Sequence, residues 1–425
     1  MKPINIGLFG FGCVGQGLYE TINNSTNFSG EIKKICIKHP EKHRSLPQHL
    51  FTTEAEELIH DPELDIIVEL IDDAEAAKSI VTQALQNGKS VVSANKKMIA
   101  QHLEELVTIQ QETGKALLYE GAVCGSIPII RTLEEYFGHE PLTALKGIVN
   151  GSTNYILTQI FTERLPYALA LEKAQALGFA ESDPRLDVQG EDAKYKLVIL
   201  LAHAFGLFVK PQDLLTVGID QISSYDLAYA HANELEIKLF ATARKVGDKV
   251  FAFVLPQFVH KSHSLINVRN EFNAVSLTGE FCDEQLLLGK GAGSLPTGAA
   301  VLSDVSALSY DYQYEYKKKL NSPREQFSNE SLIEAYVSFK NPEAINLDVF
   351  EHITERHFSF EQSHVIGELC IEKVVRMNWQ NNADVNIVLT TKEPSETLGK
   401  LSVGLLHKEV LALQEGKNVL EKISI

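Results

Sequence analysis

Short apolar runs alternate with amphipathic stretches in the first third of the chain. The apolar runs lie at residues 4–9, 32–37, 65–71, 90–93 and 116–119. Between them, helical spacing of apolar residues is found at 14–22, 74–87 and 103–113. Strands that alternate with helices favour a mostly parallel, doubly wound sheet. We therefore expect an α/β fold that begins with a Rossmann-type domain over residues 1–129.

Beyond residue 130 the pattern changes to longer helices with fewer strands. Apolar runs predict strands at 145–149, 250–255 and 272–277, and helical spacing predicts helices at 168–177 and 192–205. This pattern favours an α+β domain for substrate binding and oligomerisation over residues 130–296. A helix expected over 297–319 follows a Gly-Ala-Gly loop and would return the chain to the first domain.

Residues 320–330 are polar and poor in large aliphatic side chains, as is typical of a linker. The pattern after them predicts strand 333–339, helix 342–357, strands 364–370 and 384–390, helix 396–409 and strand 419–425. This β-α-β-β-α-β order is that of ferredoxin-like domains. We expect such a domain over residues 331–425.

A glycine motif follows the first strand directly and opens the first helix. It matches G-x-G-x-x-G and consists of Gly10, Phe11, Gly12, Cys13, Val14 and Gly15. The three glycines allow a tight turn, a close approach of the backbone to a pyrophosphate, and packing of the helix on the strand. The N-terminus of the helix would supply N–H donors to the diphosphate. The motif therefore predicts a dinucleotide cofactor.

The residues after the second strand bear on the choice of cofactor, because this position contacts the adenosine ribose. Lys38 and His39 lie there and favour the 2′-phosphate of NADP, whereas Glu41 leaves NAD open. A solvated surface lysine is an equally simple interpretation of Lys38.

Composition excludes several classes of partner and environment. The formal charge of −17 disfavours nucleic acid and anionic lipid, and no apolar run is long enough to cross a bilayer. The chain enters a strand within its first residues, which leaves no room for a secretory signal. Five cysteines without a CxxC pair are typical of reduced thiols. We expect a cytoplasmic protein that acts on a small molecule.

Three polar segments suit a small amino-acid substrate. Lys96 follows a buried strand of the first domain, where open α/β sheets bind ligands, although a surface lysine is the simpler alternative. Residues 150–155 (Asn-Gly-Ser-Thr-Asn-Tyr) can hold a carboxylate, order a nicotinamide or merely cap a helix. In the third segment, 178–196, Asp192 and Lys196 stand four residues apart on one face of a largely apolar helix. They suit proton transfer, and a plain helix salt bridge is the alternative.

Taken together, these segments resemble the homoserine dehydrogenase family over about residues 4–320. The motifs that carry the resemblance are the glycine loop, Ala94-Asn95-Lys96, residues 150–157, the block 178–196, and Gly289–Gly293 with Pro296-Thr297. The resemblance implies reversible, NAD(P)-dependent interconversion of L-aspartate 4-semialdehyde and L-homoserine, on the route to threonine and methionine. It also implies a homodimer or homotetramer.

The resemblance implies roles for individual residues. Lys196 would be the general acid and base, and Asp192 would orient it and bind substrate. Glu181 would bind the substrate ammonium with help from Asp187, and Lys96 would lie beside nicotinamide and substrate. The glycine-loop residues, Gly178 and Gly293 would line the cofactor cleft.

The family also holds a monovalent cation, usually sodium, on main-chain oxygens of a turn. That turn matches Glu120, Val123, Gly125 and Ile127, and a glycine-rich turn without an ion is the alternative.

Two features depart from the family. Asp72-Asp73 replaces two glycines near the expected nicotinamide ribose, and Lys340-Asn341-Pro342 lacks the glycine of the ligand turn of an ACT regulatory domain.

Two other functions remain open from the sequence alone. One is another oxidoreductase of the same build that acts on a different amino acid or sugar. The other is a catalytically silent nucleotide-binding regulator, which would need the glycine loop but neither Asp192 nor Lys196.

Overall fold

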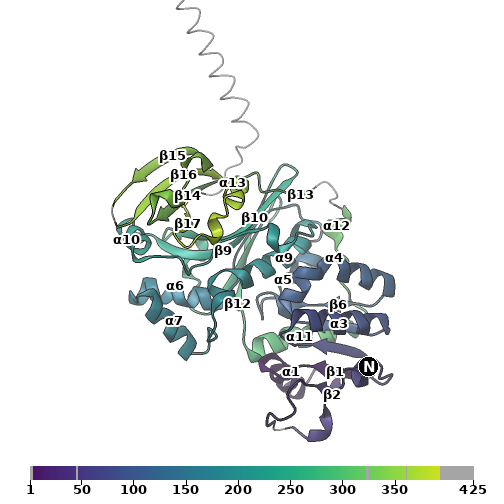
Figure 1. Cartoon of the computed structure of the whole chain (residues 1–425). Coiled ribbons are helices and arrows are strands. Elements are labelled where there is room, and N and C mark those ends of the chain that lie inside the picture. Colours follow the sequence, from purple (N-terminus) through teal and green to yellow (C-terminus); the bar gives the residue numbers. More distant parts are fainter. Residues whose placement is uncertain (1–2, 45, 322–324, 360, 393–425) are drawn as a thin grey trace, which may run out of the picture. The chain divides into compact units, whose positions relative to one another are not determined.

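The computed structural model describes residues 3–44, 46–321, 325–359 and 361–392 (Figure 1). Its contacts divide the chain into two compact units, Met1–Phe327 and Ser328–Ile425. The boundary between them in the sequence lies within the polar stretch 320–330. No helix among the described residues is both long and apolar enough to cross a membrane.

The first sheet of the larger unit is parallel throughout. Within the described residues it has six strands in the order β3-β2-β1-β4-β5-β6. Its strands are β1 (Ile4–Phe9), β2 (Gly30–Cys36), β3 (Phe51–Thr52), β4 (Ile66–Glu69), β5 (Ser90–Ser93) and β6 (Leu117–Leu118). This is the doubly wound order of dinucleotide-binding folds, so the predicted Rossmann-type fold is confirmed.

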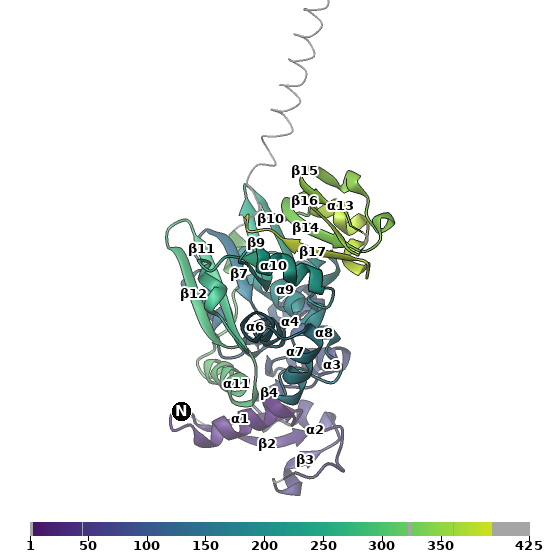
Figure 2. The ribbon, with the colours of Figure 1, turned by 90° about the vertical axis from the view of Figure 1, so that its left-hand side faces the viewer.

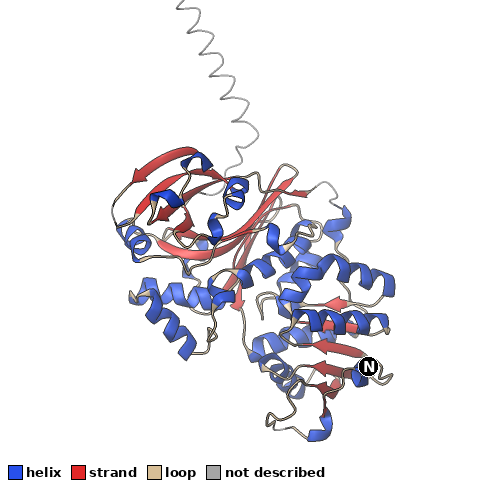
Figure 3. Cartoon of the chain, in the orientation of Figure 1, coloured by secondary structure: helices blue, strands red, loops and turns tan. Residues whose placement is uncertain are grey.

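Helices flank this sheet (Figure 3). They are α1 (Cys13–Asn24), α2 (Glu56–Ile59), α3 (Ala74–Gln86), α4 (Lys96–Thr113) and α11 (Ser294–Leu308). Helix α11 comes from far along the chain and packs on α1, beside which it lies in Figure 2. The central strand β4 is buried along its whole length, because helices cover both faces of a parallel sheet.

A second sheet follows in the larger unit, and its main strands are antiparallel. Its order is β12-β11-β7-β9-β10, and the short strands β8 and β13 pair in parallel with β10. The strands are β7 (Leu142–Ile148), β8 (Leu215–Thr216), β9 (Glu236–Val246), β10 (Lys249–Val259), β11 (Phe272–Gly279), β12 (Asp283–Lys290) and β13 (Gln326–Phe327).

Helix α9 (Glu191–Phe205) lies between the two sheets, because it contacts β7, β9 and β10 on one side and α4 on the other. From Tyr195 to Phe205 every residue is buried, as expected of a helix that is apolar all round. The other helices of this part are α5 (Ile129–Arg131), α6 (Gly151–Glu163), α7 (Tyr167–Ala176), α8 (Arg185–Val188), α10 (Ser224–Ala232) and α12 (Lys317–Asn321). A π-helical turn, η3 (Thr132–Tyr136), continues α5.

The helix predicted over 297–319 is wrong in its second half. Helix α11 ends at Leu308, and the chain then runs without helix to α12. Asp311 and Tyr316 have positive φ angles of 57° and 51°, which a helix does not allow. Tyrosines at every second position from 310 to 316 favour extended chain, and two of them, Tyr314 and Tyr316, are buried.

The smaller unit contains an antiparallel sheet in the order β17-β14-β16-β15. Its elements are β14 (Leu332–Phe339), β15 (Phe350–His357), β16 (Ser363–Cys370), α13 (Ile371–Arg376) and β17 (Val385–Leu389). The helix predicted over 342–357 is wrong, because this segment forms two short 3₁₀ turns and then β15. Asn341 and Asn346 begin those turns by accepting bonds from Glu343 N (3.0 Å) and Asp348 N (2.9 Å). The helix and strand predicted at 396–409 and 419–425 lie outside the described residues.

Candidate active site

The glycine loop lies at the carboxyl end of β1 and leads into α1. Gly10 has φ 90°, and a Cβ on it would lie 2.5 Å from Leu70 O. A Cβ on Gly15 would lie 2.5 Å from Gly10 O. Gly12 precedes the helix without a side-chain cap and faces open space. The loop therefore leaves the first N–H groups of α1 accessible to an anion, and its other two glycines are required by backbone contacts.

Helix α11 brings Gly293 to this loop. The hydroxyl of Ser294 donates to Cys13 O at 2.8 Å. A Cβ on Gly17 would lie only 2.0 Å from Ser294 O, so the two backbones are in direct contact. Gly293 itself has φ 122° and begins α11. Gly178, by contrast, follows the C-cap of α7 with φ 76° and has nothing within 4 Å of its Cβ position.

The segment after β2 forms a basic pocket. Arg44 Nη1 donates to His39 O and Lys42 O, both at 2.9 Å, and its guanidinium lies 5.3 Å from the centre of the Phe51 ring. A cavity of about 440 Å³ opens here, lined by Ile37, Pro40, Lys42, Arg44, Leu46, Gln48, Phe51, Thr52 and Thr53. Sequence reasoning named Lys38 at this position but missed Arg44, which lies farther along the loop.

The two aspartates that depart from the family pattern are exposed. Asp73 is the N-cap of α3 and accepts from Glu75 N (3.1 Å) and Ala76 N (3.0 Å). Those backbone bonds, with lesser contributions from the charges of Lys38 and Lys97, lower the pKa of Asp73. Asp73 therefore has a structural role at the start of a helix, where a carboxylate is favourable.

Lys96 begins α4 and is held by a chain of buried polar contacts that sequence reasoning missed. Glu69, fully buried at the end of β4, accepts from Ser93 Oγ (2.6 Å) and from Ile71 N (2.7 Å). Ser93 Oγ in turn accepts from Asn95 N (3.0 Å), and Asn95 caps α4 by accepting from Met98 N (2.9 Å). In the sequence, a single carboxylate within an apolar strand was the signal that Glu69 is buried and has polar partners.

Asp192 lies between two lysines at the N-terminal end of α9. Its Oδ1 is 2.8 Å from Lys96 Nζ, and its Oδ2 is 2.7 Å from Lys196 Nζ. Lys196 Nζ also donates to Val149 O at 2.7 Å. Asp192 and Lys196 are only 5% and 6% exposed, whereas the Lys96 side chain remains 42% exposed. The structure thus brings together all three residues predicted to be catalytic.

The charges of this cluster set one another's ionisation. Burial alone would raise the pKa of Asp192, but the ammonium groups of Lys196 and Lys96 together lower it well below its usual range. The carboxylate of Asp192 raises the pKa of Lys96. The carboxylate therefore stays ionised between the two cations, as expected for opposite charges in contact.

Asn150 links Asp192 to Asp187, another predicted substrate-binding carboxylate. Its Nδ2 donates to Asp192 Oδ2 at 2.9 Å and to Asp187 Oδ1 at 2.7 Å. Burial, and secondly the charge of Asp192, raises the pKa of Asp187. Glu181 is exposed, and its charge contributes to the raised pKa of Lys96. Asn150 also caps α6 through Thr153 N (2.8 Å), so the capping interpretation of that motif is confirmed, and its role toward a ligand stays a prediction.

The turn predicted to hold a cation follows β6 and connects the two sheets. Cys124 and Gly125 have successive positive φ angles of 56° and 51°. Glu120 N donates to Asp304 Oδ2 at 2.7 Å, and the Glu120 carboxylate accepts from Ile130 N and Arg131 N, both at 2.8 Å. A Cβ on Gly125 would lie 2.8 Å from Gly291 O, so the turn packs tightly on the start of the return to α11.

Comparisons with known proteins agree with this geometry. Residues 10–120 match the family model "Homoserine dehydrogenase, NAD binding domain", and residues 128–306 match "Homoserine dehydrogenase". Homoserine dehydrogenase from Bacillus subtilis is 36% identical over 381 residues, which are 85% of this chain and 87% of that protein. The homologue from Lactococcus lactis is 38% identical over 313 residues, 71% of this chain and 73% of its own length.

Solved structures give the same result. A homoserine dehydrogenase from Thiobacillus denitrificans superposes with a TM-score of 0.79 at 28% identity, over 92% of this chain and 98% of that one. A hyperthermophilic archaeal homoserine dehydrogenase mutant in complex with NADPH superposes with a TM-score of 0.63 at 26% identity, over 74% and 99%. The chain therefore belongs to the homoserine dehydrogenase family, the NAD(P)-dependent oxidoreductases that interconvert L-aspartate 4-semialdehyde and L-homoserine.

Proposed function

We propose that Lys196 is the general acid that protonates the carbonyl oxygen of L-aspartate 4-semialdehyde. The observation that carries this proposal is the burial of Asp192 between Lys96 and Lys196. An ammonium group has three N–H donors, and two of those on Lys196 point to Val149 O and Asp192. The third can be offered to a substrate oxygen.

The reaction then divides between the cofactor and the side chains of α9. The reduced nicotinamide, when bound, supplies a hydride to the carbonyl carbon. Lys196 gives its proton to the carbonyl oxygen, so that the CHO group of the substrate becomes the CH₂OH group of homoserine. Asp192 holds the ammonium in place and stabilises its charge. Lys196 regains a proton from solvent.

The remaining predicted residues would bind the amino-acid end of the substrate and the cofactor. Glu181, assisted by Asp187, would pair with the substrate ammonium, because both are carboxylates near Lys96. Lys96 would lie beside nicotinamide and substrate, and its half-exposed side chain allows this. In this proposal residues 1–129 with α11 bind the dinucleotide, and residues 130–296 supply the substrate site.

A Lys196→Ala variant tests the acid role. We expect a loss of kcat of about 10³-fold or more, with NADPH affinity within twofold of wild type. Lys194→Ala is a matched control, because Lys194 lies on the same helix and pairs with Glu191. Parallel losses of kcat and NADPH binding in Lys196→Ala would instead assign Lys196 a structural role.

We further propose that NADP is the preferred cofactor. The pocket after β2 lies where a dinucleotide-binding fold contacts the adenosine ribose, and Arg44 and Lys42 line it. A guanidinium held by two backbone carbonyls and an aromatic ring is well prepared to bind a 2′-phosphate. Steady-state rates with NADPH and NADH compare the two cofactors directly.

The cation turn also remains a proposal, with sodium on the main-chain oxygens of Glu120, Val123, Gly125 and Ile127. The supporting observation is Asn273, which is fully buried against Gly291 and beside Cys124. Among the described residues its amide has no hydrogen-bond partner besides the thiol of Cys124. Main-chain and amide oxygens suit a hard cation that braces the turn. Thermal unfolding in sodium chloride against choline chloride tests it.

Three proposals concern assembly, regulation and location. Leu286 (44% exposed) and Leu288 (56% exposed) lie on β12, at one edge of the second sheet, and suit a homodimer or homotetramer contact. The four described strands of the smaller unit have an order compatible with an ACT-like regulatory domain. Light scattering tests the first, and calorimetric titration of the full chain with threonine tests the second.

We place the enzyme in the cytoplasm, where its five unpaired cysteines stay reduced.

A further inference from the structure

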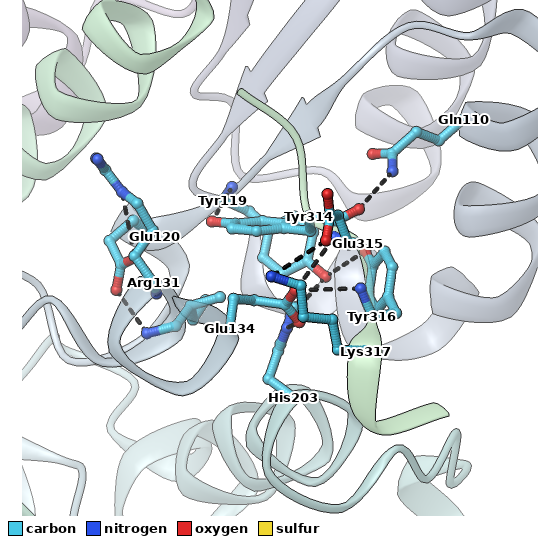
Figure 4. Close-up of polar contacts among 11 residues, drawn as sticks. Gln110, Tyr119, Glu120, Arg131, Glu134, His203, Tyr314, Glu315, Tyr316 and Lys317 are labelled. Atoms are coloured by element: carbon cyan, nitrogen blue, oxygen red, sulfur yellow. Dashed lines mark hydrogen bonds and ion pairs between the residues drawn. The ribbon is translucent and has the colours of Figure 1, made fainter. Parts of the chain in front are cut away.

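A ring of hydrogen bonds lies inside the larger unit, at the opposite end of α9 from the proposed acid. His203 on α9 contacts Glu134 on η3, with Nδ1 and Oε1 2.6 Å apart. Its Nε2 lies 2.9 Å from the hydroxyl of Tyr119, which is 2.8 Å from the hydroxyl of Tyr316. The dashed lines in Figure 4 trace these contacts.

The backbone N–H groups of Glu315 and Tyr316 close the ring. Tyr316 N donates to Glu134 Oε2 at 3.1 Å, and Glu315 N donates to the same oxygen at 3.1 Å. The rings of His203 and Tyr316 stack with centroids 5.2 Å apart, and Tyr119 packs on His203 at 5.6 Å. All four side chains are at most 5% exposed. Water therefore cannot easily replace any of these bonds.

The proton positions in the ring follow from burial and charge. Burial opposes ionisation of Glu134, but the hydrogen bond from His203 leads the contributions that lower its pKa. Because Glu134 is ionised, His203 Nδ1 carries a proton and donates it. Burial raises the pKa of Tyr119 and of Tyr316, so both keep their hydroxyl protons. The hydroxyl of Tyr316 can then donate to Tyr119, and that of Tyr119 to His203 Nε2.

The ring ties α9 to the dinucleotide-binding sheet. Tyr119 directly follows β6 of that sheet, and Lys96 begins α4, which flanks it. Helix α9 thus meets this part of the molecule twice: at Asp192 through Lys96, and at His203 through Tyr119. Asp192 and His203 are eleven residues apart, or about 16 Å along the helix axis. A helix fixed at two such points can neither slide nor turn about its axis.

We infer that His203 and Tyr119 are positioning residues for hydride transfer, which hold α9 so that Lys196 lies at the correct distance from a substrate on the dinucleotide-binding sheet. The inference rests on the proposed role of Lys196. Removing the ring would leave cofactor and substrate contacts in place but would let α9 move. Rates of transfer fall steeply with small displacements of the reacting groups.

The test uses Tyr119→Phe and His203→Leu in the full chain, with the rate of hydride transfer measured in a single turnover at saturating NADPH. We expect each variant to be about 10-fold slower than wild type, with NADPH affinity within twofold. Tyr312→Phe is the matched control. It removes a hydroxyl from the tyrosine-rich segment 310–316 that contains Tyr316, but Tyr312 is not part of the ring. It should transfer hydride at the wild-type rate.

The double variant tests whether the ring acts as one unit. Tyr119→Phe with His203→Leu should be no more than twofold slower than the slower single variant, whereas multiplied losses would overturn a common ring. Single variants that lose thermal stability but keep the wild-type transfer rate would overturn the positioning role. Tyr316→Phe replaces His203→Leu if the latter does not fold. Wild-type protein without turnover on either nicotinamide would defeat the proposed acid role instead.

Discussion

The glycine loop and the charge cluster on α9 face the same reaction but are built by opposite means. The loop works through side chains that are absent, since Gly10 and Gly15 have backbone oxygens 2.5 Å from any added Cβ. The cluster works through buried charges, with Asp192 in contact with two ammonium groups. The first site is specified by a short stretch of chain, and the second needs α4 and α9 to meet. Substitutions should therefore affect the two sites in different ways.

Of the substitutions that separate these two sites, Asp192→Asn should have the largest effect. The amide would leave two cations close together without a counter-charge, and Lys196 would lose its orienting partner. We expect kcat to fall by about 10²- to 10³-fold, with cofactor affinity nearly unchanged. Stopped-flow and steady-state kinetics measure this, and a fall confined to cofactor binding would contradict the division between the two sites.

The next effect should come from Gly15→Ala in the loop. Its Cβ would press on the backbone of Gly10, so both NADPH affinity and the melting temperature should fall, the affinity by about 10-fold or more. Gly12→Ala is the matched control, because its Cβ faces open space. It should weaken NADPH binding without lowering the melting temperature. Equal stability losses in both variants would contradict the steric argument.

Arg44→Ala should have a smaller and more selective effect. We expect the KM for NADPH to rise by about 10-fold, because its 2′-phosphate loses the guanidinium as a partner. The KM for NADH should stay within about twofold, because NADH has no 2′-phosphate. Lys33→Ala, an exposed lysine paired with Glu31 on β2, serves as the charge control. Equal rises for NADPH and NADH would assign Arg44 to loop structure.

The last prediction concerns stability alone, through the effect of pH on Glu69. Burial raises the pKa of Glu69 from 4.5 to about 7. The folded protein therefore holds a proton there that the unfolded chain has already lost. The stabilising contribution is complete below pH 4.5 and is lost as the pH rises to about 7, with a size of about 3 kcal/mol.

Chemical denaturation of Glu69→Gln across this pH range measures that contribution. The variant should lose less free energy of unfolding than wild type between pH 4.5 and 7, because the amide does not titrate. Identical pH profiles for the two proteins would show that Glu69 is already ionised in the folded state.

Much of this architecture could be predicted from the sequence where local rules apply. The glycine motif and the i, i+4 spacing of Asp192 and Lys196 each predict one local geometry, and both geometries are found. The support of Lys96 by Glu69 could not be predicted, since the two residues belong to different strand ends that only the folded sheet brings together. The ring around His203 has the same character, because its members come from four separate segments.

The two helices predicted wrongly have a common physical cause. In both 309–316 and 350–357, apolar or aromatic residues can be read with helical spacing, but contacts with another segment decide the outcome. Tyr314 and Tyr316 are buried beside His203, which is distant in sequence, and β15 pairs with the next strand, β16. Where contacts outside the segment decide its structure, local spacing is a weak guide.

The contact between α1 and α11 has a consequence for folding during synthesis. A Cβ on Gly298 would lie 2.5 Å from the carbonyl carbon of Gly17, so the two helices touch backbone to backbone across about 280 residues of intervening chain. During synthesis α1 therefore stays uncovered until Leu308, the last residue of α11, has left the ribosome. A fragment that ends at Lys290 should therefore be slow to fold and prone to aggregate.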